Sequence, residues 1–173
     1  MRGPAVPPRQ GSGPYRVHLV CLGNICRSPM AHVVLAEHLE RAGLAGAVVV
    51  TSSGTGDWHV GNPMDTRAAA TLLGAGYDGS LHRASQWDPD AQYDLALAMD
   101  HDNLAGIGGR GERRRLFRDF DPVDPGRDVP DPYYGGHEGF LEVLAMVERT
   151  SASLVDVLQS TLSESEPGRG APR

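Results

Sequence analysis

Short β-rich runs alternate with helical patterns along most of this chain. The hydrophobic pattern predicts strands at 15–20, 47–51, 95–99 and 115–117, and helices at 29–41, 65–73 and 140–162. Such alternation is typical of an α/β protein with a parallel sheet and helices on both faces. Ligands of these sheets bind beyond the carboxyl ends of the strands, so the residues after position 20 are the first candidates for a functional site.

Size and composition exclude several classes of protein. A chain of 173 residues makes one domain. A net charge of −6 argues against a nucleic-acid-binding surface, which needs a basic footprint. No apolar run reaches the roughly 18 residues that a membrane-spanning helix needs. Two cysteines are too few for a disulfide framework or a structural zinc site.

The two ends of the chain differ from the middle. Residues 1–14 are rich in Gly and Pro and lack the apolar stretch of a signal peptide, so we expect a disordered extension there. Residues 163–173 have little to bury, and we expect a disordered tail. The folded domain is expected at 15–162. With no export signal, the expected location is the cytoplasm.

The first predicted strand is followed by Cys-Leu-Gly-Asn-Ile-Cys-Arg-Ser-Pro at 21–29. Pro29 suits a first helical turn, where the missing N–H costs nothing. The loop's N–H groups and the helix N-terminus would then converge on one anion. Gly23 permits close backbone approach, and Asn24 tolerates a left-handed conformation. Arg27 adds a planar fork that can hold two phosphate oxygens.

The same positive field favours the thiolate form of Cys21, which is the nucleophilic form of a cysteine. Ser28 is placed to donate a hydrogen bond to the sulfur and help it leave later. A lone Cys at a strand end is usually a small core residue. The spacing to Arg27 and the helix start directly afterwards favour a phosphate-binding loop with a nucleophile instead.

A cysteine-based phosphatase also needs an acid that protonates the leaving oxygen. The acidic segment 119–131 offers five aspartates, and Asp131 stands out because Pro132, Tyr133, Tyr134 and two glycines follow it. Pro132 fixes the backbone beside the carboxylate. The tyrosine pair can form a wall beside a flat substrate. We therefore predict Asp131 as the acid.

These two motifs, Val-Cys-Leu-Gly-Asn-Ile-Cys-Arg-Ser-Pro and Asp-Pro-Tyr-Tyr-Gly, resemble those of the low molecular weight protein tyrosine phosphatases. The segment 52–65 is most similar to the bacterial branch. The resemblance covers about 15–162 and implies a four-stranded parallel sheet flanked by helices, with the phosphate-binding loop after the first strand. It also implies hydrolysis of phosphotyrosine in proteins through a phosphocysteine intermediate, with Cys21 as nucleophile, Arg27 binding the phosphoryl oxygens and Asp131 as general acid.

Further site residues follow from the motifs and the resemblance. Ser52 and His82 match positions that support the loop, although an ordinary surface histidine is nearly as plausible for His82. Trp58 matches the aromatic rim, with core packing as the alternative. The residues expected at the substrate are Leu22, Gly23, Asn24, Ile25, Cys26, Ser28, Trp58, Tyr133 and Tyr134. No metal or other cofactor is expected, because Arg27 and backbone amides already neutralise the phosphate. The partners expected are phosphotyrosine proteins, with no nucleic acid or membrane, and the protein is expected to be a monomer.

Cys26 has two interpretations. The first is a buried thiol that packs under the phosphate loop. The second is a redox guard, which would condense with oxidised Cys21 and stop its oxidation at a reversible stage.

Three alternatives compete with tyrosine phosphatase activity. Arsenate reduction on this fold needs further cysteines to pass a disulfide along, and Cys26 is the only other thiol. Phosphoarginine hydrolysis is found in relatives with Thr where this chain has Ile25. A phosphopeptide-binding module without catalysis would not need Cys21, Arg27 and Asp131 together. Turnover of an aryl phosphate would distinguish an active phosphatase from such a binding module.

Overall fold

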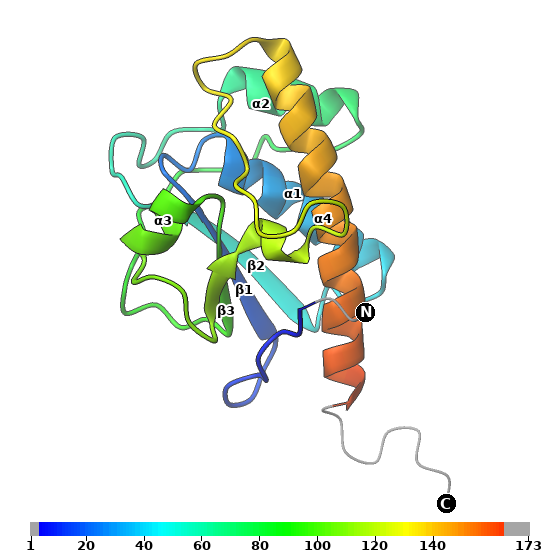
Figure 1. The fold of residues 1–173 in the computed structure, drawn as a ribbon. Coiled ribbons are helices and arrows are strands. Elements are labelled where there is room, and N and C mark those ends of the chain that lie inside the picture. The colour runs from blue at the N-terminus through cyan, green and yellow to red at the C-terminus, as the bar shows by residue number, and fades with distance from the viewer. Residues whose placement is uncertain (1–3, 165–173) are drawn as a thin grey trace, which may run out of the picture.

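The computed structural model describes residues 4–164 and contains one four-stranded sheet (Figure 1). All the strand pairs are parallel, and the strand order is β2-β1-β3-β4. The strands are β1 (Tyr15–Cys21), β2 (Val48–Gly54), β3 (Leu95–Ala98) and β4 (Arg114–Leu116). The single α/β domain with a four-stranded parallel sheet that the sequence predicts is confirmed.

Helices cover both faces of the sheet. The helices are α1 (Arg27–Arg41), α2 (Thr66–Gly74), α3 (His101–Gly106), the 3-10 helix η1 (Phe117–Phe120) and α4 (His137–Glu164). The side chains of Val17 and Leu19 in β1 face the main core with α1 and α4, which lie side by side (Figure 1). Val20 points to the other face, where it packs with Leu104 of α3 in a smaller core.

Several boundaries differ from those expected from the sequence. Helix α1 begins at Arg27 instead of Pro29, so Arg27 belongs to its first turn. Helix α4 begins at His137 and ends at Glu164, which extends it at both ends. The sequence analysis missed α3 and η1, which have six and four residues. Elements this short carry too little hydrophobic periodicity to be recognised.

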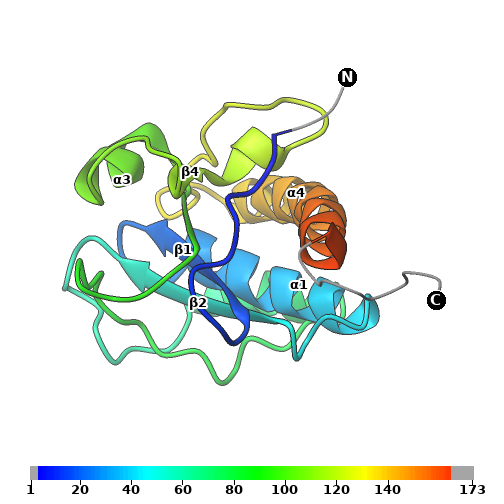
Figure 2. The ribbon, with the colours of Figure 1, turned by 90° about the horizontal axis from the view of Figure 1, so that it is seen from below.

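The N-terminal segment contradicts the expectation of disorder for the residues that the structure describes. Val6 is buried in the main core, and the Tyr15 hydroxyl donates a hydrogen bond of 2.7 Å to the Pro7 carbonyl. Arg115 donates to the Ala5 carbonyl. Figure 2 shows the described part of this segment as a dark blue trace that leads into β1. Burial of an apolar side chain together with long-range hydrogen bonds offsets the entropy cost of ordering such a segment.

The expected C-terminal tail lies mostly outside the described residues. Ser163 and Glu164 belong to α4 instead of the tail. Residues 1–3 and 165–173 lie outside the described residues. The expectation of disorder for these two ranges therefore stays a prediction.

A buried carboxylate holds α4 to the segment that follows η1. The Asp121 side chain accepts hydrogen bonds from Arg118 Nε at 3.0 Å and from Arg149 Nε and Nη2 at 2.9 Å each. Burial tends to raise the pKa of Asp121, but the hydrogen bonds from Arg149, Val123 and Arg118 hold it well below the usual range of a carboxyl. The charged form of Asp121 therefore stabilises the fold at neutral pH. This contribution declines as the pH falls below the ordinary pKa of a carboxyl and is lost completely once the pH passes below the low folded-state pKa.

We predict that Asp121→Asn destabilises the protein by about 3 kcal/mol, because it leaves the buried Arg118 guanidinium with only the half-exposed Asp124 carboxylate, 3.6 Å away. Urea unfolding at pH 7 measures the change. The control is Asp156→Asn, at an exposed position of α4. Equal stability of the two variants would show that the Asp121 cluster contributes nothing.

Candidate active site

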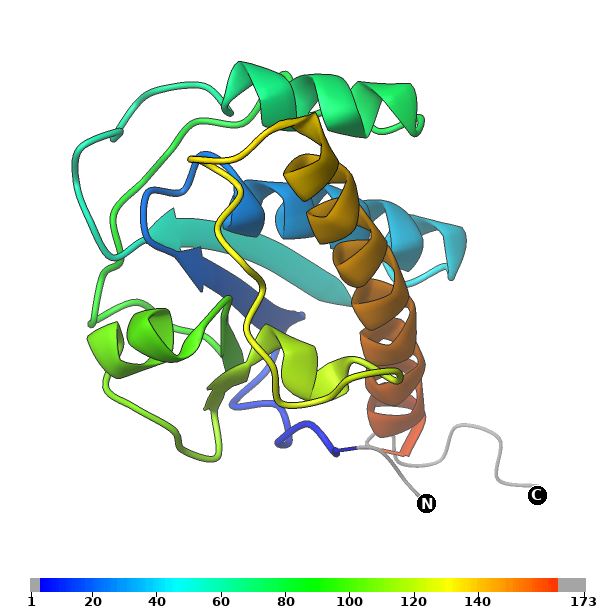
Figure 3. The same ribbon diagram turned by 45° about the horizontal axis from the view of Figure 1, so that its top comes forward.

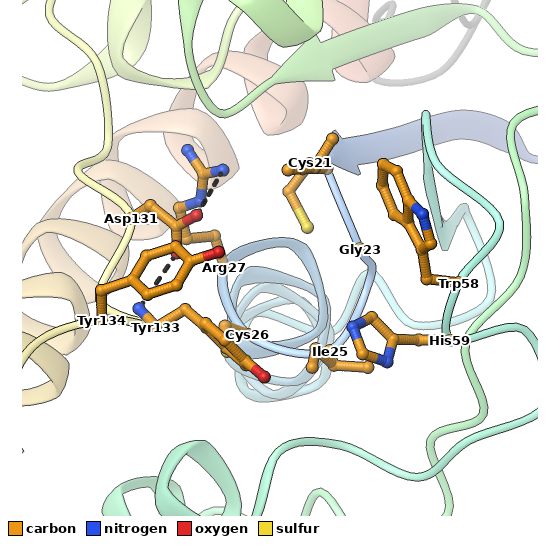
Figure 4. Close-up of a pocket in the computed structure, with 11 residues that line it drawn as sticks. Cys21, Gly23, Ile25, Cys26, Arg27, Trp58, His59, Asp131, Tyr133 and Tyr134 are labelled. Atoms are coloured by element: carbon orange, nitrogen blue, oxygen red, sulfur yellow. Dashed lines mark hydrogen bonds and ion pairs between the residues drawn. The ribbon is translucent and has the colours of Figure 1, made fainter.

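The loop between β1 and α1 wraps around one point at the carboxyl edge of the sheet (Figure 4). Cys21 is the last residue of β1, and Arg27 is the first residue of α1. Asn24 has a φ of 57°, the left-handed conformation that the sequence analysis expected it to tolerate. The loop is also tied to the two residues that follow β2, because Thr55 N donates to the Cys21 carbonyl and Gly56 N to the Leu22 carbonyl, each at 2.9 Å.

The Cys21 sulfur lies among hydrogen-bonding groups. Its Sγ is 3.0 Å from Ser28 Oγ and accepts a hydrogen bond from Asn24 N at 3.2 Å. Both contacts place polar groups directly at this sulfur, beneath the loop. The contact with Ser28 is the one expected from the sequence.

Arg27 is buried and held on three sides. Its Nη1 donates to Asp100 Oδ2 at 2.6 Å and to the Val129 carbonyl at 3.0 Å, and its Nη2 is 3.7 Å from Asp131 Oδ2. Burial tends to lower the pKa of Arg27, but the hydrogen bond to Asp100 and the nearby Cys21 and Asp131 raise it above its ordinary value. The guanidinium is therefore a fixed cation beside Cys21.

A network of side chains supports the loop from beneath. Asn24 Nδ2 donates to Ser28 Oγ at 2.8 Å and to Ser52 Oγ at 3.1 Å, and Asn24 Oδ1 accepts from Ser85 N at 2.9 Å. His82 Nε2 donates to the Asn24 carbonyl at 2.7 Å. Burial lowers the pKa of His82, so the ring is neutral at pH 7 and carries its proton on Nε2. Ser52 and His82 both meet the loop at Asn24.

Gly54 leaves room for this loop. A Cβ atom on Gly54 would lie 2.6 Å from the Leu22 carbonyl oxygen and 3.0 Å from Asn24 N. Both neighbours are backbone atoms of the phosphate loop, which cannot move without changing the loop's shape. The close approach of β2 to the loop therefore requires glycine at this position.

A cavity of about 290 Å³ opens above Cys21. Trp58 and Tyr134 stand at its mouth, with 69% and 91% of their surfaces exposed. Tyr133 and Tyr134 pack edge to face with ring centroids 5.0 Å apart. The lining residues are Cys21, Leu22, Gly23, Ile25, Cys26, Arg27, Trp58, His59, Asp131, Tyr133 and Tyr134. Among the residues expected at the substrate, Asn24 and Ser28 do not line the cavity, because their side chains are buried beneath the loop.

Two residues of the site were missed by sequence reasoning. His59 lines the cavity, with its ring over Gly23, where a Cβ would lie 3.0 Å from His59 Cδ2. Asp100 pairs with Arg27. A signal was available for Asp100, since it directly follows the third predicted strand, at the edge where ligands of parallel sheets bind.

Asp131 faces the cavity from the segment before α4. Its Oδ1 accepts a hydrogen bond from Tyr133 N at 3.1 Å, and its side chain is 37% exposed. Figure 4 shows Asp131, Tyr133 and Tyr134 on one side of the cavity, with Trp58 and His59 on the other. A substrate in the cavity would thus meet a thiol, a guanidinium and a carboxyl together.

No group of three or more His, Cys, Asp or Glu within 4–164 is arranged to hold a metal ion. None of the described helices is long and apolar enough to cross a membrane.

Comparison with known proteins defines the family. The family model for low molecular weight phosphotyrosine protein phosphatase matches residues 16–164. Low molecular weight protein-tyrosine phosphatase A of Mycobacterium tuberculosis is 43% identical over 162 residues, covering 90% of this chain and 99% of the relative. The low molecular weight protein-tyrosine-phosphatase of Streptomyces coelicolor is 42% identical over 167 residues, covering 91% and 99%.

A solved structure agrees with these matches. The crystal structure of a protein tyrosine phosphatase from Entamoeba histolytica superposes with a TM-score of 0.79 at 29% identity, covering 84% of this chain and 97% of that one. The chain belongs to the low molecular weight phosphotyrosine protein phosphatase family, a family of enzymes. The family and the enzyme class expected from the sequence are confirmed.

We predict that Gly54→Ala lowers kcat/KM on an aryl phosphate by about 100-fold, because displacing a reacting group by about 1 Å costs that much. Steady-state kinetics measure the change. Gly74→Ala is the matched control, since a Cβ at Gly74 meets no atom within 4 Å. Equal activity of the two variants would contradict the role of Gly54 in shaping the loop.

Proposed function

We propose that the protein hydrolyses phosphotyrosine in proteins through a phosphocysteine intermediate. The observation that carries the proposal is the convergence of Cys21, Arg27 and Asp131 on one cavity. These three groups supply a nucleophile, a phosphate-binding cation and a proton donor, which together suffice for a displacement at phosphorus.

In the first step, the Cys21 thiolate attacks phosphorus and the S–P bond forms as the P–O bond to the tyrosine breaks. The phenolate oxygen takes a proton from Asp131, so that neutral tyrosine leaves and Asp131 becomes a carboxylate. Arg27 and the loop amides bind the non-bridging oxygens, where charge develops in the transition state. Asp100 and the Val129 carbonyl fix the guanidinium, so little reorganisation is needed as the reaction proceeds.

In the second step, water attacks the phosphorus and gives a proton to the Asp131 carboxylate. The S–P bond breaks, Cys21 leaves as a thiolate and inorganic phosphate is released. Ser28 Oγ, 3.0 Å from the sulfur, stabilises the departing thiolate. Both active residues return to their starting protonation states, so the cycle closes.

The walls of the cavity support phosphotyrosine as the substrate. Ile25 offers apolar contact deep in the cavity, and Trp58 and Tyr133 flank a flat ring near the mouth. A phosphoserine side chain is too short to place its phosphorus at Cys21. Apolar γ-carbons at Ile25 suit a phenyl ring better than the polar edge of a phosphoarginine guanidinium.

We further propose that the catalytic domain extends beyond the expected 15–162, from the buried Val6 to the end of α4 at Glu164, and that the protein is a cytoplasmic monomer. It acts on phosphotyrosine proteins and has neither nucleic acid nor membrane as a partner. The reaction uses no metal or other cofactor, because Arg27 and the loop amides carry the charge on the phosphate.

The test replaces the nucleophile and the acid separately. Cys21→Ser is expected to abolish turnover of a phosphotyrosine peptide, and Asp131→Asn to reduce it by about 100-fold or more. Wild type is expected to turn over the matching phosphoserine peptide far more slowly. An unchanged rate for Cys21→Ser, or equal efficiency on both peptides, would overturn the proposal.

We also propose that Cys26 guards Cys21 against irreversible oxidation. Both cysteines are free thiols that line the same cavity. Peroxide oxidises Cys21 to a sulfenic acid, and the Cys26 sulfur displaces its hydroxyl to give a disulfide and water. Burial, with the Asp65 carboxylate nearby, raises the pKa of Cys26 to about 12, so Cys26 is a neutral thiol at pH 7 and gives its proton to the departing hydroxyl as the disulfide forms.

The guard role predicts a loss of recovery, measured against each variant's own starting activity. After the same peroxide dose, dithiothreitol should restore most wild-type activity but little of the activity of Cys26→Ala or Cys26→Ser. Bound phosphate should slow inactivation in all three proteins. Equal fractional recovery in wild type and both variants would leave Cys26 as a packing residue.

A further inference from the structure

Asp131 lies in the segment 128–136, called the acid segment below. Before Asp131 this segment is firmly held: the Asp128 carbonyl accepts from Arg118 Nη1 at 2.6 Å, and Arg27 binds the Val129 carbonyl and faces Asp131. Beyond Asp131, Pro132 is buried, but the hydrogen bond from Gly135 N to the Pro132 carbonyl is internal to the segment. The contacts made by Tyr133 and Gly135 therefore decide how the far end of the acid segment is held.

Arg67, in the first turn of α2, holds that far end. Its guanidinium carbon lies 5.4 Å from the centre of the Tyr133 ring and 4.8 Å from the centre of the Phe140 ring. Its Nη1 also donates to the Gly135 carbonyl at 3.5 Å. One cation thus contacts Tyr133 and Gly135 in the acid segment and Phe140 in α4. Figure 3 shows the start of α4 beside α2, which brings these groups together.

Asp65 fixes the direction of Arg67. Its Oδ1 accepts from Arg67 Nε at 3.2 Å, and its Oδ2 accepts from Arg67 Nη2 at 3.1 Å. This two-point pairing orients the plane of the guanidinium, which a single contact would not do. Asp65 N donates in turn to the Ile25 carbonyl of the phosphate loop at 2.9 Å. A continuous chain of contacts therefore runs from the phosphate loop through Asp65 and Arg67 to the acid segment.

The start of α2 does not need the Arg67 side chain. Asp65 caps the helix by accepting from the backbone N–H groups of Arg67 at 2.8 Å and Ala68 at 3.3 Å. Both bonds use main-chain donors, so they persist when the Arg67 side chain is changed. A substitution at Arg67 therefore tests the contact with the acid segment without removing the cap.

We propose that Arg67 is a positioning residue for the general acid, acting through Tyr133 and Gly135 on Asp131. The inference rests on the proposed phosphatase mechanism and deepens it. Without Arg67, the acid segment loses its tie to α2, and Asp131 spends less time at the leaving oxygen. Protonation of the leaving group suffers, whereas attack by Cys21 on phosphorus does not.

The test uses aryl phosphates whose leaving phenols differ in basicity. General acid catalysis matters most for basic leaving groups, so a misplaced acid slows phenyl phosphate more than 4-nitrophenyl phosphate. For Arg67→Gln we expect kcat/KM to fall about tenfold on phenyl phosphate and by less than about threefold on 4-nitrophenyl phosphate. Arg67→Lys keeps the charge but loses the two-point pairing with Asp65, and should show the same trend more weakly.

Arg41→Gln is the matched control. Arg41 also pairs with a carboxylate, Glu37 at 3.1 Å, and also stands over a ring, Tyr77 at 5.9 Å, but it lies at the end of α1, outside the cavity lining. It should follow wild type across the whole substrate series. Equal losses on all substrates for Arg67→Gln would indicate a merely structural effect and overturn the inference.

A double variant tells this inference apart from the mechanism on which it rests. If Arg67 acts through Asp131, adding Arg67→Gln to Asp131→Asn should cause no further loss on phenyl phosphate. Losses that multiply would overturn the positioning role while leaving the acid role of Asp131 intact. If Asp131→Asn itself shows no dependence on the leaving group, the proposed acid is wrong, and the role of Arg67 fails with it.

Discussion

The buried pairing of Arg27 with Asp100 is the contact on which the rest of the site depends. It joins the first turn of α1 to the residue that follows β3, and the same guanidinium holds the Val129 carbonyl and faces Asp131. Three segments distant in the sequence thereby meet at one cation. A buried guanidinium without a carboxylate would be costly, so the pairing with Asp100 also allows a full positive charge to remain beside Cys21. The same contact therefore sets both the charge beside Cys21 and the position of the first turn of α1.

The backbone of the phosphate loop is fixed before any ligand arrives. Asn24, in the left-handed conformation, is held by Ser28, Ser52, Ser85 and His82, and Gly54 allows β2 to lie directly against the loop. Hydrogen-bond donors that already point at the site do not have to reorient during the reaction. Such preorganisation is the main source of electrostatic stabilisation of transition states in enzymes. The acid segment is built differently. Before Asp131 it is held by Arg27, and after Asp131 its contacts to α2 come from the single exposed side chain of Arg67.

Local sequence was enough to predict the parallel sheet and three residues that line one cavity, Cys21, Arg27 and Asp131. Hydrophobic periodicity marks the strands and the long helices. The loop from Cys21 to Arg27 is predictable because its conformation is set largely by its own residues, so its local sequence is informative. Contacts made by residues far apart were not predictable. The partnership of Asp100 with Arg27 and the position of His59 over Gly23 both depend on the tertiary fold. The ordered segment before β1 was missed for a similar reason, since its Gly-Pro composition indicates disorder whereas Val6 finds a place in the core.

The two tryptophans of the chain lie in contrasting surroundings. Trp58 stands at the mouth of the cavity with 69% of its surface exposed, and its ring folds over Gly56. Trp87 is half-buried between His18 and Tyr93, with ring centroids 5.5 Å away on each side, and does not line the cavity. A molecule entering the cavity changes the solvent around one indole and leaves the other as it was. The chain thus carries an intrinsic fluorescent reporter of occupancy, together with an internal reference for its signal.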